Sequence, residues 1–246
     1  AVKSLAQIRR SEVIEPLLWV IDDSMAEVRV TAIEALSSFH HKSLIPVFIK
    51  ALQDTSSSVR KEAVIALKMR AYLEKEFDLV NRLQPLLFDI NSEVCQQAVL
   101  AMGCMKDSSA ITALSDILKA KNAPLFIKEE VVRALNWNNS SIALDSLESC
   151  LYSSDIMLIQ EIVCVLGRQE SIELKSYATK VLIDFLNSDR EIVHQSYIKQ
   201  KIATSLGDNQ DLSALAHLEK LATNDDSKVR LYANSAIKKL LKQNNK

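Results

Sequence analysis

The chain has 246 residues, 48% of them hydrophobic, and a formal net charge of −1. Basic and acidic residues are balanced in both halves, so the sequence lacks the basic stripe that a nucleic-acid-binding surface requires. Only three glycines and four prolines occur. That is too few for the many tight turns of a sheet-rich fold, and we therefore expect an all-α protein.

The remaining composition predicts a cytoplasmic chain. No apolar run is long enough to span a membrane, and no signal-peptide pattern is visible. The cysteines have neither CxxC spacing nor a histidine at metal-ligand spacing. We interpret all four as small buried hydrophobic residues in a reducing compartment: Cys95, Cys104, Cys150 and Cys164.

The first predicted elements are an amphipathic segment over residues 2–10, which would cap the array, and a series of helical pairs. The clearest pair lies in residues 45–80, where a helix over 46–52 is followed by turn formers at 54–58 and a second helix. Four apolar residues fall on one face of that second helix, at the spacing of 3.6 residues per turn: Val59, Ala63, Ala66 and Leu67.

This turn and helix recur along the chain. Equivalents of Val59 recur along the chain at spacings of 31 to 40 residues. Together with Val59 they form the set that we call the Val59 column: Val28, Val94, Ile127, Leu158, Ile198 and Val229. A period of this length is typical of stacked helical hairpins. The sequence predicts one domain over residues 1–246, with about seven hairpins at 11–44, 45–80, 81–109, 110–143, 144–178, 179–214 and 215–246.

Two further sets of equivalent positions recur with the same spacing as the Val59 column. Asp54 and Arg60 recur as Asp23 and Arg29, and such a pair could reach across to the next copy, whereas Cys95 replaces the arginine of the third copy. All three glycines lie nine residues after the Val59 column: Gly103, Gly167 and Gly207. We interpret them as helix ends in the left-handed conformation.

The aspartate, arginine and alanine–leucine pattern, together with Pro46, resembles HEAT-like repeats. The short period, and endings such as Val165-Leu166-Gly167, look like the bacterial subgroup typified by phycobilisome-lyase HEAT-like repeats. The resemblance covers roughly residues 12–240. It implies a right-handed α-solenoid whose second helices line a concave groove.

If the second helices line a groove, we expect its side chains two, six and nine places after the Val59 column, unless these are ordinary solvated positions. Trp137, among three asparagines that follow the second helix of the fourth copy, is an additional contact candidate. The predicted partner-binding residues are Lys61, Lys68, Gln96, Glu129, Arg133, Asn136, Trp137, Gln160 and Gln200. Amide and small side chains with isolated charges fit a protein partner better than a polyanion.

The sequence carries no recognisable catalytic, cofactor-binding or metal-binding motif. A HEAT-like hydroxylase would need His-Glu dipeptides, and none of the four histidines is followed by glutamate. We therefore expect a non-catalytic scaffold that binds a protein partner and needs no cofactor. The resemblance leaves one alternative open, a bilin lyase or lyase subunit that handles a tetrapyrrole and a phycobiliprotein.

Overall fold

The computed structural model describes residues 11–152 and 155–244. Over these ranges the chain forms helices α2 to α15 and six short 3-10 segments, with no strand. The predicted all-α solenoid of hairpins is confirmed, and the segment expected at 2–10 lies outside the described residues. The chain divides into two compact units, Ala1–Ile117 and Leu118–Lys246, and the boundary falls inside α8 (Ser108–Lys119).

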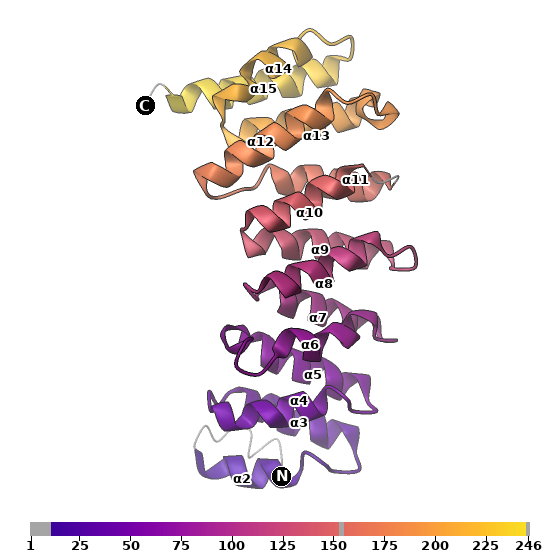
Figure 1. Cartoon of the computed structure of the whole chain (residues 1–246), viewed down its shortest axis with the longest axis vertical. Helices are drawn as coiled ribbons and strands as arrows, with labels where there is room; N and C mark the ends of the chain where they lie inside the picture. Colours follow the sequence, from indigo (N-terminus) through magenta and orange to yellow (C-terminus); the bar gives the residue numbers. More distant parts are fainter. Residues whose placement is uncertain (1–10, 153–154, 245–246) are drawn as a thin grey trace. The chain divides into compact units, whose positions relative to one another are not determined.

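Unit 1 consists of three helical hairpins followed by most of α8 (Figure 1). The hairpins pair α2 (Ile14–Trp19) with α3 (Ala26–Ser37), α4 (Ile45–Ala51) with α5 (Ser57–Lys68), and α6 (Leu79–Leu83) with α7 (Ser92–Gly103). The first helix of each hairpin is short. Pro46 lies in the first turn of α4, as predicted, where its missing N–H leaves no hydrogen bond unmade.

Unit 2 begins with the end of α8 and with α9 (Leu125–Asn138), and continues with three hairpins. These pair α10 (Ser141–Leu151) with α11 (Ile156–Leu166), α12 (Ile172–Leu186) with α13 (Ser196–Asn209), and α14 (Leu215–Leu221) with α15 (Ser227–Asn244). Helix α12 begins before the repeat boundary that we expected at residue 179. Its start is fixed by Ser171, whose Oγ accepts a hydrogen bond from the backbone N–H of Leu174 at 3.2 Å.

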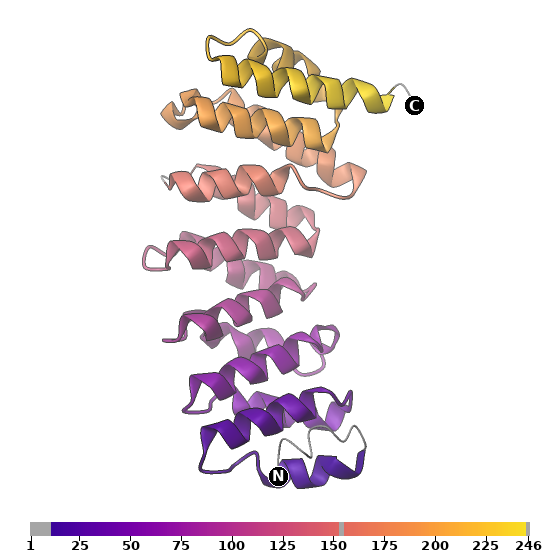
Figure 2. The same cartoon turned by 180° about the vertical axis from the view of Figure 1, so that it is seen from behind.

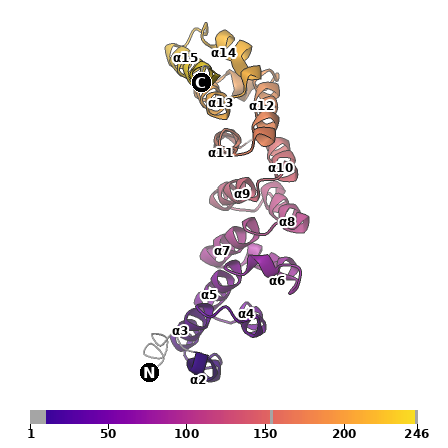
Figure 3. The ribbon, with the colours of Figure 1, turned by 90° about the vertical axis from the view of Figure 1, so that its left-hand side faces the viewer.

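Within each unit the helices form two layers. The second helices of the hairpins pack on one another, α5 between α3 and α7 in unit 1, and α11 and α13 between α9 and α15 in unit 2 (Figure 3). Figure 2 shows these second helices in front of the first ones. The apolar column lies in the core between the layers. Six of its members are at most 2% exposed: Val59, Val94, Ile127, Leu158, Ile198 and Val229.

The turns before α3, α5, α7 and α15 are each closed by one acidic or amide side chain. Asp54 Oδ1 accepts a hydrogen bond from the backbone N–H of Ser56 at 2.8 Å, which satisfies a donor that would otherwise be unpaired near the helix start. The side-chain oxygens of Asp23, Asp89 and Asn224 likewise each accept a hydrogen bond from the backbone N–H two residues later in the chain. The recurring aspartate is therefore a turn residue, as its position in the sequence predicted.

The recurring arginines connect neighbouring hairpins. Arg29 donates two hydrogen bonds to Asp54 of the next hairpin, at 2.8 and 2.7 Å, and one to the backbone carbonyl of Asp23, at 2.8 Å. Arg60 repeats this pattern with Asp89 and the carbonyl of Asp54. The expected contact between copies is thus made by the arginine of one copy and the aspartate of the next.

The contacts of Arg29 with Asp54 and of Arg60 with Asp89 form a series that we call the arginine–aspartate ladder. It ends at the third hairpin, where Cys95 takes the place of the arginine. Its Sγ donates to the backbone carbonyl of Leu87 at 2.8 Å. Burial raises the pKa of the Cys95 thiol to about 11, so the thiol is protonated at neutral pH and is a poor nucleophile.

The arginine–aspartate ladder predicts a loss of stability in acid. The hydrogen bonds from Arg29 lower the pKa of Asp54. Burial opposes the shift at Asp89, but the Arg60 and Asn91 hydrogen bonds still lower the pKa of that carboxyl. Because both folded-state pKa values lie below the ordinary value, the stabilisation is complete above about pH 4 and disappears as the pH falls through the folded-state values.

We expect the urea concentration that half-unfolds wild type to fall steeply below about pH 4. An Asp89→Asn variant should unfold at a lower urea concentration at neutral pH, and this concentration should fall less steeply as the pH is lowered. If the urea midpoints of the two proteins fall equally steeply in acid, the ladder does not cause this pH dependence.

The glycines do not adopt the left-handed conformation that we expected. No described glycine has a positive φ, and the left-handed residues are Asp78, Asn139 and Gln210 instead. Gly167 and Gly207 permit close helix packing. A Cβ on Gly167 would lie 2.6 Å from the Cα of Ser205, and a Cβ on Gly207 would lie 2.7 Å from the Cβ of Ala236.

A column of buried polar side chains, which we did not predict, lies eleven residues after the Val59 column. Arg70 donates to the carbonyls of Ser37 and Phe39 near the end of α3. Asn209 donates to the carbonyl of Leu166 at the end of α11. Both side chains therefore satisfy carbonyl groups that a helix leaves unpaired at its C-terminus.

Candidate functional site

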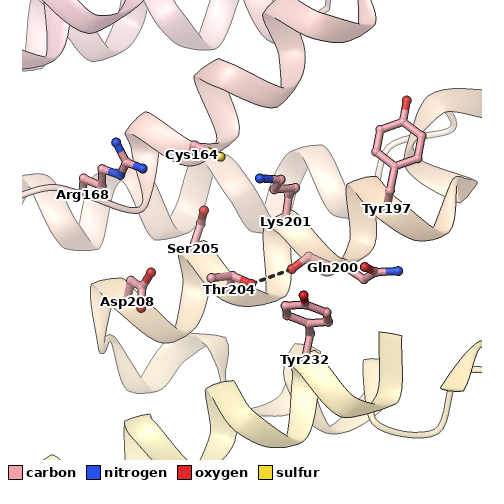
Figure 4. A pocket seen from close by; sticks show the side chains of 9 residues that line it. All are labelled: Cys164, Arg168, Tyr197, Gln200, Lys201, Thr204, Ser205, Asp208 and Tyr232. Carbon is pink, nitrogen blue, oxygen red and sulfur yellow. Dashed lines mark hydrogen bonds between the residues drawn. The ribbon is translucent and has the colours of Figure 1, made fainter. Parts of the chain in front are cut away.

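A hollow on the second-helix layer lies over α11, α13 and α15 of unit 2 (Figure 4). Its volume is about 270 Å³, and it is open to solvent. Helix α13 contributes most of the lining, and the full set is Cys164, Arg168, Tyr197, Gln200, Lys201, Thr204, Ser205, Asp208 and Tyr232. The hollow forms because small residues, Cys164, Thr204 and Ser205, lie between longer side chains on the neighbouring helices.

The free charges of this hollow are positive. Arg168 and Lys201 are both exposed, and Figure 4 shows the Lys201 side chain extending from α13 toward Cys164 of α11. Asp208 also lines the hollow, but its Oδ1 lies 2.6 Å from the Nζ of Lys239 in an ion pair. An incoming ligand therefore meets two cations and one carboxylate that already has a counter-ion.

The polar and aromatic groups around these charges can contact an extended chain. Tyr232 is 44% exposed and approaches from α15, while Tyr197 and Gln200 are half-buried on α13. The hydroxyl of Thr204 donates to the backbone carbonyl of its own helix at Gln200, at 2.9 Å. The Gln200 amide is left to contact solvent or a ligand.

A smaller hollow of about 150 Å³ lies at the C-terminal ends of α9 and α11. It is lined by Asn136, Trp137, Asn139, Arg168, Gln169 and Glu170. Because Arg168 lines both hollows, the two are adjacent, and we call their combined lining the α9–α15 face. Trp137 is 56% exposed, and its contact role stays a prediction.

The predicted site residues of unit 1 form contacts between neighbouring hairpins. Lys61 Nζ lies 2.7 Å from Glu93 Oε2, and Lys68 Nζ lies 3.2 Å from Gln97 Oε1. Gln96 is half-buried on α7. The two lysines are therefore already engaged, which the sequence did not indicate because their partners lie about 30 residues away.

The predicted residues of unit 2 fall into two groups. Arg133 is held by Glu130 and Glu161, each at 3.0 Å, and the Oδ1 of Asn136 accepts a hydrogen bond from Gln169 at 2.7 Å. Glu129 and Gln160 are half-buried on α9 and α11. The residues that line the hollows are Asn136, Trp137 and Gln200.

Most residues that line the face lie outside the columns chosen from the sequence. The ninth position after the Val59 column is buried wherever it is glycine, at Gly103, Gly167 and Gly207. The exposed column is the tenth, which contains Trp137, Arg168 and Asp208. A signal was present, because this column is polar or large at each of these three positions.

The interpretation of the cysteines is correct for two of the four. Cys95 and Cys150 are buried, but Cys104 is exposed and Cys164 is half-exposed in the larger hollow. Within residues 11–152 and 155–244, no three His, Cys, Asp or Glu side chains are grouped so that they could hold a metal ion. No described helix combines the length and the apolar character needed to cross a membrane.

Comparison with known proteins agrees with the hairpin architecture. A family model of HEAT repeats matches residues 14–83 and 45–126. Residues 14–126 are HEAT-like repeats. The family model thus matches much of unit 1, whereas in unit 2 the repeat is seen in the recurring columns and helical pairs.

The chain is also similar to Protein YibA of Escherichia coli K12, with 27% identity over 161 residues that cover 63% of this chain and 55% of YibA. The chain thus spans about half the length of the curated relatives it matches. The crystal structure of Escherichia coli YibA has a TM-score of 0.60 at 20% identity, covering 98% of this chain and 85% of that one.

A second solved structure is the CpcE–CpcF complex of phycocyanin lyase from Nostoc sp. PCC7120. It has a TM-score of 0.50 at 16% identity and covers 92% of this chain and 94% of that one. At these identities the two structures establish a shared fold alone.

Proposed function

We propose that the chain is a non-catalytic scaffold that binds a protein partner on the α9–α15 face. The observation that supports this is the adjacency of two solvent-open hollows that share Arg168 and are lined from α9, α11, α13 and α15. Exposed aromatic rings, amides and a few charges alternate along it, which is the mixture that protein-binding surfaces use.

The shape of the larger hollow favours a macromolecule over a small substrate. Its volume of about 270 Å³ is at the low end of ligand pockets, which are typically about 300–1,000 Å³ and enclose most of the ligand. This hollow is open along the helix layer. A side chain or short segment of a larger partner could occupy it while the rest of the partner contacts the neighbouring helices.

Site-specific photo-crosslinking tests the proposal. A photoreactive phenylalanine analogue at Gln200, within the face, is expected to capture a partner from native lysate. The control position is Lys180, an exposed residue on α12 in the first helix of the same hairpin. Capture through position 180 with none through position 200 would place the binding surface on the first-helix layer and contradict the proposal.

A bilin lyase or lyase subunit is the second candidate, favoured by the fold shared with the phycocyanin lyase complex. Under this alternative the partners would be a bilin and a phycobiliprotein. Mixing the purified chain with bilin and apo-phycobiliprotein tests it, since chromophore transfer would support lyase activity. An unchanged bilin absorbance spectrum would contradict it and leave the scaffold proposal standing.

A further inference from the structure

We propose that the partner segment bound at the larger hollow is acidic, with carboxylates that contact Arg168 and Lys201. This inference rests on the proposed binding function and adds the chemistry of the partner. It concerns the hollow over α11, α13 and α15, whose lining residues all belong to unit 2.

The first observation is a charge excess that the whole-chain composition conceals. Helices α13 and α15 together carry seven basic residues: Lys199, Lys201, Lys228, Arg230, Lys238, Lys239 and Lys242. Asp208 is their only acidic residue, so the two helices have a formal charge of 7 − 1 = +6 in a chain whose net charge is −1. Such a local field attracts anionic partners and raises their association rate.

The second observation is that two of the nearby carboxylates are already paired, while the exposed Glu170 lines the smaller hollow and not the larger one. Asp208 is bound to Lys239, and Glu161 of the adjacent helix α11 is bound to Arg133. Asp225 and Asp226, in the turn before α15, do not line the hollow. Arg168 and Lys201 are exposed at the hollow, and a carboxylate from a partner is a suitable counter-ion for each.

The third observation separates a peptide from a nucleic acid. A phosphate backbone gains its affinity from a series of cations that each replace a counter-ion. This hollow offers two cations, one carboxylate, two tyrosines and an amide. The tyrosine rings of Tyr197 and Tyr232 can pack on aliphatic side chains, and the Gln200 amide can hydrogen-bond a peptide backbone. An acidic segment with interspersed apolar residues satisfies all three kinds of group.

Fluorescence anisotropy with defined peptides tests this inference on the full chain. The probe is a labelled peptide of glutamate and leucine, and its analogue has glutamine in place of each glutamate. We expect wild type to bind the glutamate peptide and not the analogue. Arg168→Gln or Lys201→Gln should each weaken binding about threefold to fivefold, as for a solvent-exposed charge pair, with a larger loss in the double variant. The matched control Lys180→Gln, on α12, should bind as wild type does.

Four results would overturn the inference. The glutamine analogue could bind as well as the glutamate peptide, or the two substitutions could leave binding unchanged. A single-stranded oligonucleotide could also bind as tightly as the peptide and lose affinity in the same variants, which would indicate a general polyanion surface. If the glutamate peptide does not bind but a partner is still captured through position 200, this inference fails while the proposed binding function stands.

Discussion

Replacing Arg70 with methionine is expected to destabilise unit 1 by about 3 kcal/mol, because three backbone carbonyls then lose a charged hydrogen-bond donor. The Arg70 side chain is 1% exposed. It donates to Ala66 at 2.6 Å, to Ser37 at 2.8 Å and to Phe39 at 2.6 Å. Its guanidinium carbon lies 4.9 Å from the centre of the Phe48 ring.

The size of this effect follows from what the substitution leaves behind. Methionine has a similar reach and fills much of the same space, so the cavity is small. A buried carbonyl without a donor costs about 1–3 kcal/mol, and the loss is partly offset because a charge no longer has to be buried. Burial does lower the pKa of Arg70, which reflects that opposing contribution.

Chemical denaturation followed by circular dichroism measures the change. The matched control is Arg82→Met on α6, because Arg82 is exposed in the same unit. It should change the free energy of unfolding by less than about 0.5 kcal/mol. Equal stabilities of the Arg70 and Arg82 variants would show that the buried guanidinium does not stabilise the contact between the first two hairpins.

Replacing Gly207 with alanine is expected to destabilise the last two hairpins by about 1–3 kcal/mol, as overpacking of a core does. Gly207 lies inside helix α13, where alanine would ordinarily stabilise by about 0.5–1 kcal/mol. Here the added Cβ would lie 2.7 Å from the Cβ and 2.8 Å from the Cα of Ala236 on α15. These distances force α13 and α15 apart, and the packing loss exceeds the gain in helix propensity.

A double-mutant cycle with Ala236→Gly isolates this packing effect. Removing the Cβ of Ala236 relieves one of the two close contacts. The double variant should therefore be more stable than the sum of the two single changes predicts. Strict additivity, or a Gly207→Ala variant more stable than wild type, would contradict the close-packing role.

The fold could be predicted from the sequence because the same pattern of apolar and turn-forming residues recurs in several hairpins. The Val59 column, the turn-forming aspartates and Pro46 all follow local rules of helix periodicity and turn chemistry, and each lies in the structure where those rules place it. The same register located the glycines correctly. Their role could not be predicted, because the atoms that exclude a side chain belong to the next hairpin, such as Ala236 opposite Gly207.

The candidate site was predictable only in part, for the same reason. Gln200 and Trp137 were found because one lies two places after the column and the other interrupts the repeat. Arg168 and Lys201 were missed. Only the structure shows that these two side chains have no counter-ion among the described residues, while other charged side chains are paired. Lys61 and Arg133 looked equally free in sequence, but glutamates from neighbouring hairpins hold both.

If the protein partner binds the second-helix layer of unit 2, reversing a charge on that layer should weaken binding more than the same reversal on the first-helix layer. The most direct test is the affinity of the protein captured through position 200 for two charge-reversal variants, Lys201→Glu on α13 and Lys180→Glu on α12, which make the same change of charge. We predict that Lys201→Glu weakens binding by about tenfold and that Lys180→Glu leaves it unchanged. Equal affinities of the two variants, or a loss caused by Lys180→Glu alone, would contradict the account.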